Sequence, residues 1–253
     1  TEIYTLSLHD ALPIFIKSIS SLNDYNFIIK ENNINTGFKF PNTKINVTKK
    51  KNSLISLNWK QKQFSYTHRK NNTNETLTYR GDNVNNYVKF DDKNWRILKI
   101  VNNRLVLIYN QKFEKQVWDD RYNIDKQSNV GINDFTKSRM KDYLENIYSE
   151  NTLISESEKG SLVKYSLPIG KRNVGNEDKT GQVENSNLVE NEYIGLLTVS
   201  DFLYASIDGN CKNSQSQSCS NYNYLADYGY NYWTITADNQ TSFNVFSIIS
   251  AGY

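Results

Sequence analysis

The sequence predicts an α+β domain over residues 79–253, built from β-hairpins and two or three helices and preceded by a small β-rich segment. Two observations predict this class. Paired apolar runs of β type occur near residues 87–109 and 232–249, and an amphipathic helical pattern covers residues 133–150. The 253 residues, with 18 Tyr and 11 Phe, are enough for one large domain or two small ones with an aromatic core.

The best-defined element is a hairpin. Residues 95–101 and 104–109 are apolar runs of β type, and only Asn102-Asn103 separates them. Asn tolerates positive φ, so this pair predicts a two-residue hairpin turn. Residues 87–90 form a further predicted strand, joined to the hairpin by a turn at residues 91–94.

The helical pattern at residues 133–150 places its apolar side chains at steps of three and four, on one face of a helix. Asn133 or Asp134 is the expected N-cap. A second, weaker helix is predicted at residues 154–165, interrupted by Gly160. Residues 170–190 are polar and are expected to form a long surface loop.

The C-terminal part predicts further alternation of strand and helix. Residues 193–199 are apolar and predict a strand, after which Ser200-Asp201 is expected to cap a short helix ending near Ala205. Residues 232–236 and 243–249 predict a second hairpin around a polar turn.

The N-terminal part predicts less. Residues 15–78 carry short apolar stretches about ten residues apart, which favours a small antiparallel β module. Residues 69–76 (RKNNTNET) hold no apolar side chain and are expected to be a linker or long loop. Residues 1–14 (TEIYTLSLHDALPI) resemble translated sequencing-adapter sequence, so we treat them as an artefact outside the fold.

Charge and hydropathy exclude two classes of partner. The net charge of +3 comes from 30 basic and 27 acidic residues that are scattered together, which gives no broad basic face for nucleic acid. No apolar run reaches the roughly 18 residues that a membrane span needs. Membrane attachment is therefore expected only through an N-terminal anchor missing from this sequence.

Four stretches resemble a family of predicted surface proteins of low-G+C Gram-positive gut bacteria, related to C-type-lectin-like and formylglycine-generating-enzyme-like folds. They are GDNVNNYVKFDDKNWRILKI (81–100), IGLLTVSDFLYAS (194–206), NYL (223–225) and WTITADNQTSFNVFSIISAG (233–252). The resemblance implies a C-type-lectin-like ectodomain, an extracellular or cell-surface location, and a chain truncated at its C-terminus. It implies no activity, because this fold hosts many functions.

Few residues could support catalysis. His9 lies in the excluded leader and His68 in a polar segment, so the matched domain lacks the imidazole that triads and His-based zinc sites need. In an exported protein, Cys211 and Cys219 are expected to form a disulfide. The alternative is a reactive copper-binding pair, as in the related sulfatase-modifying oxygenases, but seven residues separate these cysteines and no ligand supports them. We expect no cofactor and no enzymatic activity.

A calcium site is the weaker metal hypothesis. Asp119, Asp120, Asn123 and Asp125 form the densest group of oxygen ligands, but a loop with water-facing carboxylates is the favoured interpretation. The Glu-Pro-Asn, Gln-Pro-Asp and Trp-Asn-Asp triplets of calcium-dependent lectins are absent, and Trp118-Asp119-Asp120 only approximates the last. Calcium-dependent sugar binding is therefore disfavoured.

Aromatic side chains give the remaining hypothesis. Tyr and Trp suit protein or glycan contact, although alternate positions of a strand face the core. The predicted binding face comprises Tyr222, Tyr224, Tyr228, Tyr230, Asp238 and Asn239. We therefore expect an extracellular recognition or structural module for an unknown protein or glycan. The alternatives are a copper- and oxygen-dependent enzyme and a pilus-like assembly subunit.

Overall fold

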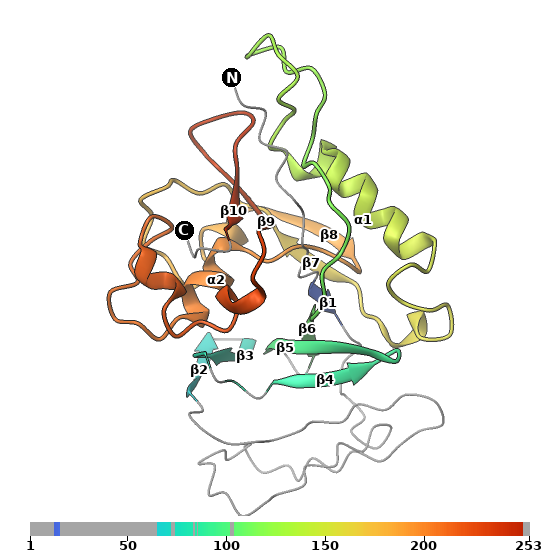
Figure 1. Ribbon diagram of the computed structural model, residues 1–253, viewed down its shortest axis with the longest axis vertical. Helices are drawn as coiled ribbons and strands as arrows, with labels where there is room; N and C mark the ends of the chain where they lie inside the picture. Colours follow the sequence, from blue (N-terminus) through green and yellow to red (C-terminus); the bar gives the residue numbers. More distant parts are fainter. Residues whose placement is uncertain are drawn as a thin grey trace, which may run out of the picture.

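A computed structural model describes residues 13–15, 65–71, 74–82, 84, 86–101 and 104–249, and shows a mixed α+β architecture (Figure 1). The central element is a six-stranded antiparallel sheet with strand order β1-β6-β5-β3-β2, and β4 also pairs with β5. Its strands are β1 (Pro13–Phe15), β2 (Ser65–Asn71), β3 (Asn74–Arg80), β4 (Tyr87–Phe90), β5 (Lys93–Val101) and β6 (Arg104–Tyr109).

The predicted β5–β6 hairpin is confirmed, with Ile97 opposite Leu107 and Val101 opposite Arg104. Every residue from Leu105 to Tyr109 is buried. Successive side chains of a strand point to opposite faces, so both faces of β6 are covered. Trp95, on β5, lies 4.9 Å from the ring of Tyr109 and anchors the aromatic core.

The turn between β4 and β5 is confirmed but shorter than predicted, because β5 begins at Lys93. Asp91 and Asp92 have φ of 50° and 56°, the backbone of a two-residue type I′ hairpin turn. The Asp91 carboxylate accepts hydrogen bonds from the backbone N–H and the hydroxyl of Ser155, at 2.8 and 2.6 Å. This turn therefore also fixes the position of the chain at Ser155.

The linker predicted at residues 69–76 is wrong. Residues 69–71 and 74–76 form the ends of β2 and β3, which pair from Ser65 opposite Arg80 to Asn71 opposite Asn74. The backbone ladder needs no apolar side chains, so apolar content alone missed these strands. The domain boundary predicted after residue 78 falls inside β3, which pairs with β5 in the central sheet. Pro13 and Ile14, which were expected to lie outside the fold, pair in β1 with Ile108 and Leu107 of β6. The other stretches of the predicted 15–78 module, and residues 1–12, lie outside the described residues.

The predicted helix at 133–150 is confirmed as η2 (Phe135–Lys137) followed by α1 (Arg139–Ser149). The N-cap prediction is half right: Asp134 caps η2, but the Ser138 hydroxyl caps α1 by accepting from the Lys141 N–H. The apolar face of α1 buries Met140, Leu144 and Ile147.

The second predicted helix, at 154–165, is wrong. Only one turn forms, η3 (Lys159–Ser161), and the chain then enters β7 (Tyr165–Pro168), which pairs with β8 (Leu188–Glu192). Ile154, Glu158 and Leu162 are buried at steps of four, so their burial pattern resembles that of a helix. The backbone nevertheless closes only short turns here, with bonds from Glu158 and Lys159 to the Ser155 carbonyl and from Leu162 to the Lys159 carbonyl.

The strand predicted at 193–199 is also wrong. Residues 194–198 are buried but form no strand: Ile194 makes an isolated bridge, and the Leu197 carbonyl accepts a hydrogen bond from the Ile235 N–H at 2.7 Å. The helix α2 (Val199–Ala205) begins after Thr198, which forms a capping box with Asp201. Thr198, and not Ser200, is therefore the N-cap.

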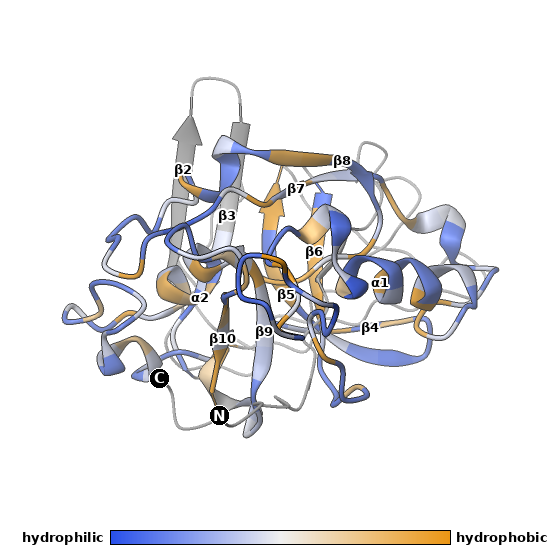
Figure 2. Ribbon diagram, turned by 90° about the horizontal axis from the view of Figure 1, so that it is seen from above, coloured by the Kyte–Doolittle hydropathy of each residue, from blue (hydrophilic) through white to orange (hydrophobic). Residues whose placement is uncertain are grey.

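The second predicted hairpin is confirmed as β9 (Tyr232–Ala237) and β10 (Val245–Ile248). Between α2 and β9 lie the turns η5 (Gln217–Ser220) and η6 (Ala226–Tyr228). Figure 2 shows hydrophobic residues concentrated on β6 and α2, with mostly hydrophilic connecting loops. Within the described ranges no helix has the length and apolar character to span a membrane.

The β4–β5 turn gives a stability prediction. Asp92→Gly should raise the free energy of unfolding by about 0.5–1 kcal/mol, because glycine adopts positive φ without a Cβ clash and Asp-Gly suits a type I′ turn. The ion pair lost, Lys89–Asp92, involves an aspartate side chain that is 99% exposed, so it contributes little. Urea unfolding measures the change. Asp92→Ala is the control, and an equal gain there would contradict the conformational explanation.

Candidate functional site

The site is built around the loop that joins β7 to β8, residues 169–187. The sequence predicts a polar surface loop here, but two of its charged side chains, Arg172 and Glu184, are completely buried. Their ion pair measures 3.0 Å between Nη1 and Oε1. A charge removed from water is costly unless it is paired and hydrogen-bonded, so this pair needs a specific set of partners.

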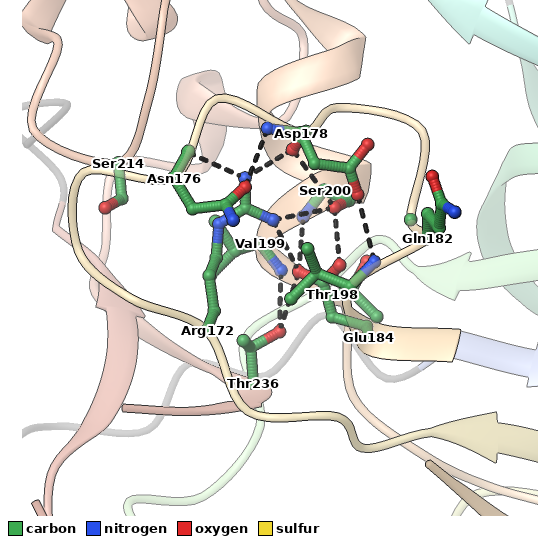
Figure 3. A network of polar contacts seen from close by, with 12 residues as sticks. Arg172, Asn176, Asp178, Gln182, Glu184, Thr198, Val199, Ser200, Ser214 and Thr236 are labelled. Atoms are coloured by element: carbon green, nitrogen blue, oxygen red, sulfur yellow. Dashed lines mark hydrogen bonds and ion pairs between the residues drawn. The ribbon is translucent and has the colours of Figure 1, made fainter. Parts of the chain in front are cut away.

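Those partners come from three elements (Figure 3). The Ser200 hydroxyl of α2 donates to Glu184 Oε2 at 2.6 Å, and the Ser200 N–H donates to Oε1 at 3.2 Å. The Thr236 hydroxyl of β9 lies 3.4 Å from Glu184 Oε1 and accepts from the Val199 N–H at 3.0 Å. The carboxylate therefore ties the loop to both α2 and β9.

The Arg172 guanidinium connects two parts of the same loop. Arg172 Nη2 donates to the carbonyl oxygens of Asn176 and Asp178, while Nη1 donates to Ser200 as well as to Glu184. The backbone also closes at Gly170, whose N–H donates to the Glu184 carbonyl at 2.8 Å. A Cβ at Gly170 would lie 2.2 Å from the Val183 carbonyl oxygen, so only glycine permits this approach.

The outer side of this loop forms one wall of a polar cleft with a volume of about 950 Å³. Residues 179–182 and 184–186 line that wall, and in Figure 3 the side chain of Gln182 points away from the buried network. The remaining lining comes from β3, β5, β7 and the start of α2: Thr78, Lys99, Val101, Tyr165, Pro168, Thr198, Ser200, Asp201 and Tyr204. A pocket of this size can hold a small-molecule ligand.

Three carboxylates at or beside the cleft are already engaged. Glu184 is held as described, and Asp201 pairs with Lys99 at 2.7 Å while accepting from the Thr198 N–H. Burial alone would raise the pKa of Asp178, but hydrogen bonds from Thr180 and Val183 outweigh it and hold that pKa below its ordinary value. Burial opposes the charge on Lys99, yet Asp201 raises the Lys99 pKa above its ordinary value. Asp178 and Lys99 are therefore charged at neutral pH.

The predicted disulfide between Cys211 and Cys219 is present and lies beside this site. Both cysteines are buried, although the loop between them is hydrophilic. The Cys211 carbonyl accepts a hydrogen bond from Lys179 Nζ of the cleft wall, and the Ser214 hydroxyl donates to the Val174 carbonyl at 2.6 Å. These two hydrogen bonds therefore connect the disulfide-closed loop to the 169–187 loop.

The predicted aromatic binding face does not form a single exposed surface. Tyr224 is fully buried, and the Arg96 guanidinium stacks 4.4 Å from its ring. Tyr228 and Tyr230 are half-buried and pack together at 5.5 Å, so only Tyr222, at 57% exposure, is an open aromatic side chain of this group. Strand and turn packing draws these rings into the core, which corrects the prediction.

The last two residues of the predicted binding face, Asp238 and Asn239, also differ from each other in exposure. Asp238 is buried: its backbone N–H donates to the Asn244 carbonyl, and its carboxylate accepts from the Gln240 N–H. Asn239 is exposed and contacts Asn173 at 3.2 Å. Asp238 therefore cannot belong to a contact face.

The calcium candidates do not converge. Asp119 pairs with Arg121 at 2.8 Å, and Asp120 pairs with Arg139 at 2.9 Å. The Asn123 side chain donates to the Gly131 carbonyl at 2.6 Å, while Asp125 is exposed. Among the described side chains, His, Cys, Asp and Glu form no group of three or more that could hold a metal ion. His68 lies in β2, opposite Leu77, and its side chain is outside the described part.

Comparisons with protein-family models, with curated proteins and with solved structures gave no match. The site must therefore be interpreted from its own residues. Sequence reasoning missed Arg172 and Glu184 because charged residues in a polar stretch normally face water. One available signal was Gly170, near the start of the loop, because isolated glycines often mark close backbone approaches.

The buried ion pair gives the second prediction. Arg172→Met should lower the free energy of unfolding by about 3–5 kcal/mol, because it leaves the Glu184 carboxylate buried without its counter-charge. Adding Glu184→Gln should recover part of this loss, since the amide keeps an acceptor for Ser200 but carries no charge. Denaturant unfolding of the two variants measures the difference.

The matched control is Arg139→Met, which removes an exposed partner of Asp120 and should cost less than about 1 kcal/mol. Equal losses in Arg172→Met and Arg139→Met would show that the buried pair is not the anchor of the loop.

Proposed function

We propose that this chain is an extracellular, non-enzymatic recognition module of a bacterial surface protein, with a C-type-lectin-like domain that binds a polar ligand in the cleft beside residues 179–186. The proposal rests mainly on one observation: a loop exposed on one side is fixed from within by a fully buried ion pair. A rigid, preformed wall lowers the ordering cost of binding.

The charged groups of the cleft favour binding over catalysis. A general acid or base needs a pKa near the operating pH and access to the substrate. Here the Glu184 and Asp201 carboxylates are engaged by Arg172 and Lys99, and Asp178 is held ionised by its hydrogen bonds. These contacts suit a surface that presents fixed charges and hydroxyl groups to a ligand.

The disulfide supports the extracellular part of the proposal, because such bonds persist mainly in oxidising compartments. It closes a short loop, and in the chain-entropy model it stabilises the fold by about 2–3 kcal/mol. The C-type-lectin-like part is supported by the α+β architecture and by the terminal β9–β10 hairpin at the position that the family resemblance implies.

The location can be tested on intact producing cells. We expect an added protease to remove the protein from unbroken cells, and Cys211 and Cys219 to react with an alkylating reagent only after reduction. Mass spectrometry of the alkylated chain reads out the second result. Protein that stays protected inside the cell, with both thiols alkylated before reduction, would refute the extracellular assignment. Free thiols at Cys211 and Cys219 that bind copper would favour the oxygenase alternative.

The cleft can be tested with Ser186→Trp, which places a large ring on an exposed position of the cleft wall. In a ligand screen by saturation-transfer NMR, we expect compounds that bind the unmodified protein to show no saturation-transfer signal with Ser186→Trp. We also expect the unmodified protein to leave these compounds chemically unchanged after long incubation. Ser149→Trp, at the exposed end of α1, is the control. Conversion of a bound compound to a product would contradict the non-enzymatic function, and undiminished binding to Ser186→Trp would contradict the location.

A further inference from the structure

The charges that line the cleft are unequally balanced. Lys99 is paired with Asp201, and Glu184 is paired with Arg172. Lys179 is different: among the described side chains no carboxylate forms an ion pair with it, and its amine donates to the Cys211 carbonyl. Within the described part of the chain, one end of the cleft therefore carries a cation that no carboxylate approaches to ion-pair distance.

Two further cations lie near Lys179, together with two carboxylates. Burial lowers the pKa of Lys179, and the neighbouring Arg80 and Lys212 lower it further, while Asp208 and Glu177 oppose the effect. The net pKa lies below the ordinary value for lysine, because burial and repulsion by the two cations outweigh the two carboxylates. A ligand carboxylate placed there would relieve this repulsion and accept charge-assisted hydrogen bonds.

Apart from the buried Glu184, the rest of this cleft wall is polar but uncharged. Thr180, Gln182, Asn185 and Ser186 are exposed along the lining loop. The Asn185 amide nitrogen donates to the Gly181 carbonyl at 2.6 Å, and the Ser186 hydroxyl donates to the Val183 carbonyl at 2.7 Å. The side-chain oxygens of both residues can therefore act as acceptors for a ligand. Amide and hydroxyl groups in such a row match the donors and acceptors of sugar hydroxyls.

The strands that line the cleft supply apolar contact. Tyr165 and Pro168 of β7 and Val101 of β5 belong to the lining, and a tyrosine ring combines apolar area with a polar edge, which suits the C–H face of a sugar ring. A peptide strand would instead need unpaired backbone groups. Along the loop wall the N–H groups of Val183, Asn185 and Ser186 are already hydrogen-bonded within the loop. The lining therefore favours a saccharide over a peptide.

We propose that the cleft binds an acidic saccharide, with the carboxylate of the sugar at Lys179 and its hydroxyl groups along residues 180–186. This inference rests on the proposed function and specifies its ligand class. Lys179 selects for the negative charge, and Gln182 contributes to affinity without selecting for charge. The Arg172–Glu184 pair holds both residues in place from behind.

The test measures binding of the full chain to acidic oligosaccharides and to their methyl esters, which keep the rings and hydroxyl groups but lose the charge. Trigalacturonate, a hyaluronan tetrasaccharide and sialyllactose form the panel, with hexaglutamate as an acidic peptide. We expect at least one acid to bind about tenfold more tightly than its ester, as one charge-assisted hydrogen bond allows. Isothermal titration calorimetry gives the affinities.

Variants separate charge from shape. Lys179→Gln should abolish the preference for acid over ester, and Lys179→Arg should restore it. Gln182→Ala should weaken acid and ester by the same factor. Lys112→Gln, at an exposed position away from the cleft lining, is the control and should change neither affinity. Thermal unfolding of each variant distinguishes lost binding from lost folding.

Three outcomes would overturn the inference in different ways. Equal affinity for acids and esters would remove the charge selection and leave the recognition function intact. Tighter binding of hexaglutamate than of every saccharide would replace the ligand class with an acidic peptide. Absence of binding by every probe, with folded protein, would refute both the ligand class and the cleft as the recognition site.

Discussion

The buried ion pair between Arg172 and Glu184 is the constraint on which the architecture of this region depends. At zero exposure, both charged groups have lost their hydration, so the protein must supply hydrogen bonds in its place, and within the described structure only Arg172 Nε of the guanidinium is left without a partner. Ser200 of α2 and Thr236 of β9 help to replace those of the carboxylate, and backbone carbonyls at 176 and 178 those of the guanidinium. One pair of side chains therefore sets the relative positions of a loop, a helix and a strand.

The consequence appears on the other side of the same loop. A chain of polar residues would ordinarily sample many conformations, and a ligand would have to order them at a cost in affinity. Here the ordering is accomplished during folding, and Lys179, bonded to the carbonyl of the disulfide-linked Cys211, adds a second fixed point. The cleft wall is consequently polar and exposed, yet held like a core element.

The sequence predicted best where the determinants are local. The β5–β6 hairpin follows from two apolar runs around Asn102-Asn103, and α1 follows from the spacing of Met140, Leu144 and Ile147. Predictions failed where burial depends on distant partners. Residues 193–199 are as apolar as a buried strand, but no hydrogen-bonded ladder forms there, and the Leu197 carbonyl accepts a backbone bond from the Ile235 N–H. The Arg172–Glu184 pair left no periodic pattern, because its partners come from separate elements.

The aromatic residues explain why the predicted and observed sites differ. Tyr224 and Tyr232 are almost fully buried, and burial raises the pKa of both hydroxyl groups far above the ordinary value, so the rings remain neutral core components. The high density of tyrosine in this part of the sequence therefore reflects packing in the core and not an exposed binding surface. In a chain so rich in aromatic residues, the more informative sign of a binding surface is a polar loop whose own charged residues point inward, because such a loop has a fixed shape that its exposed residues can use.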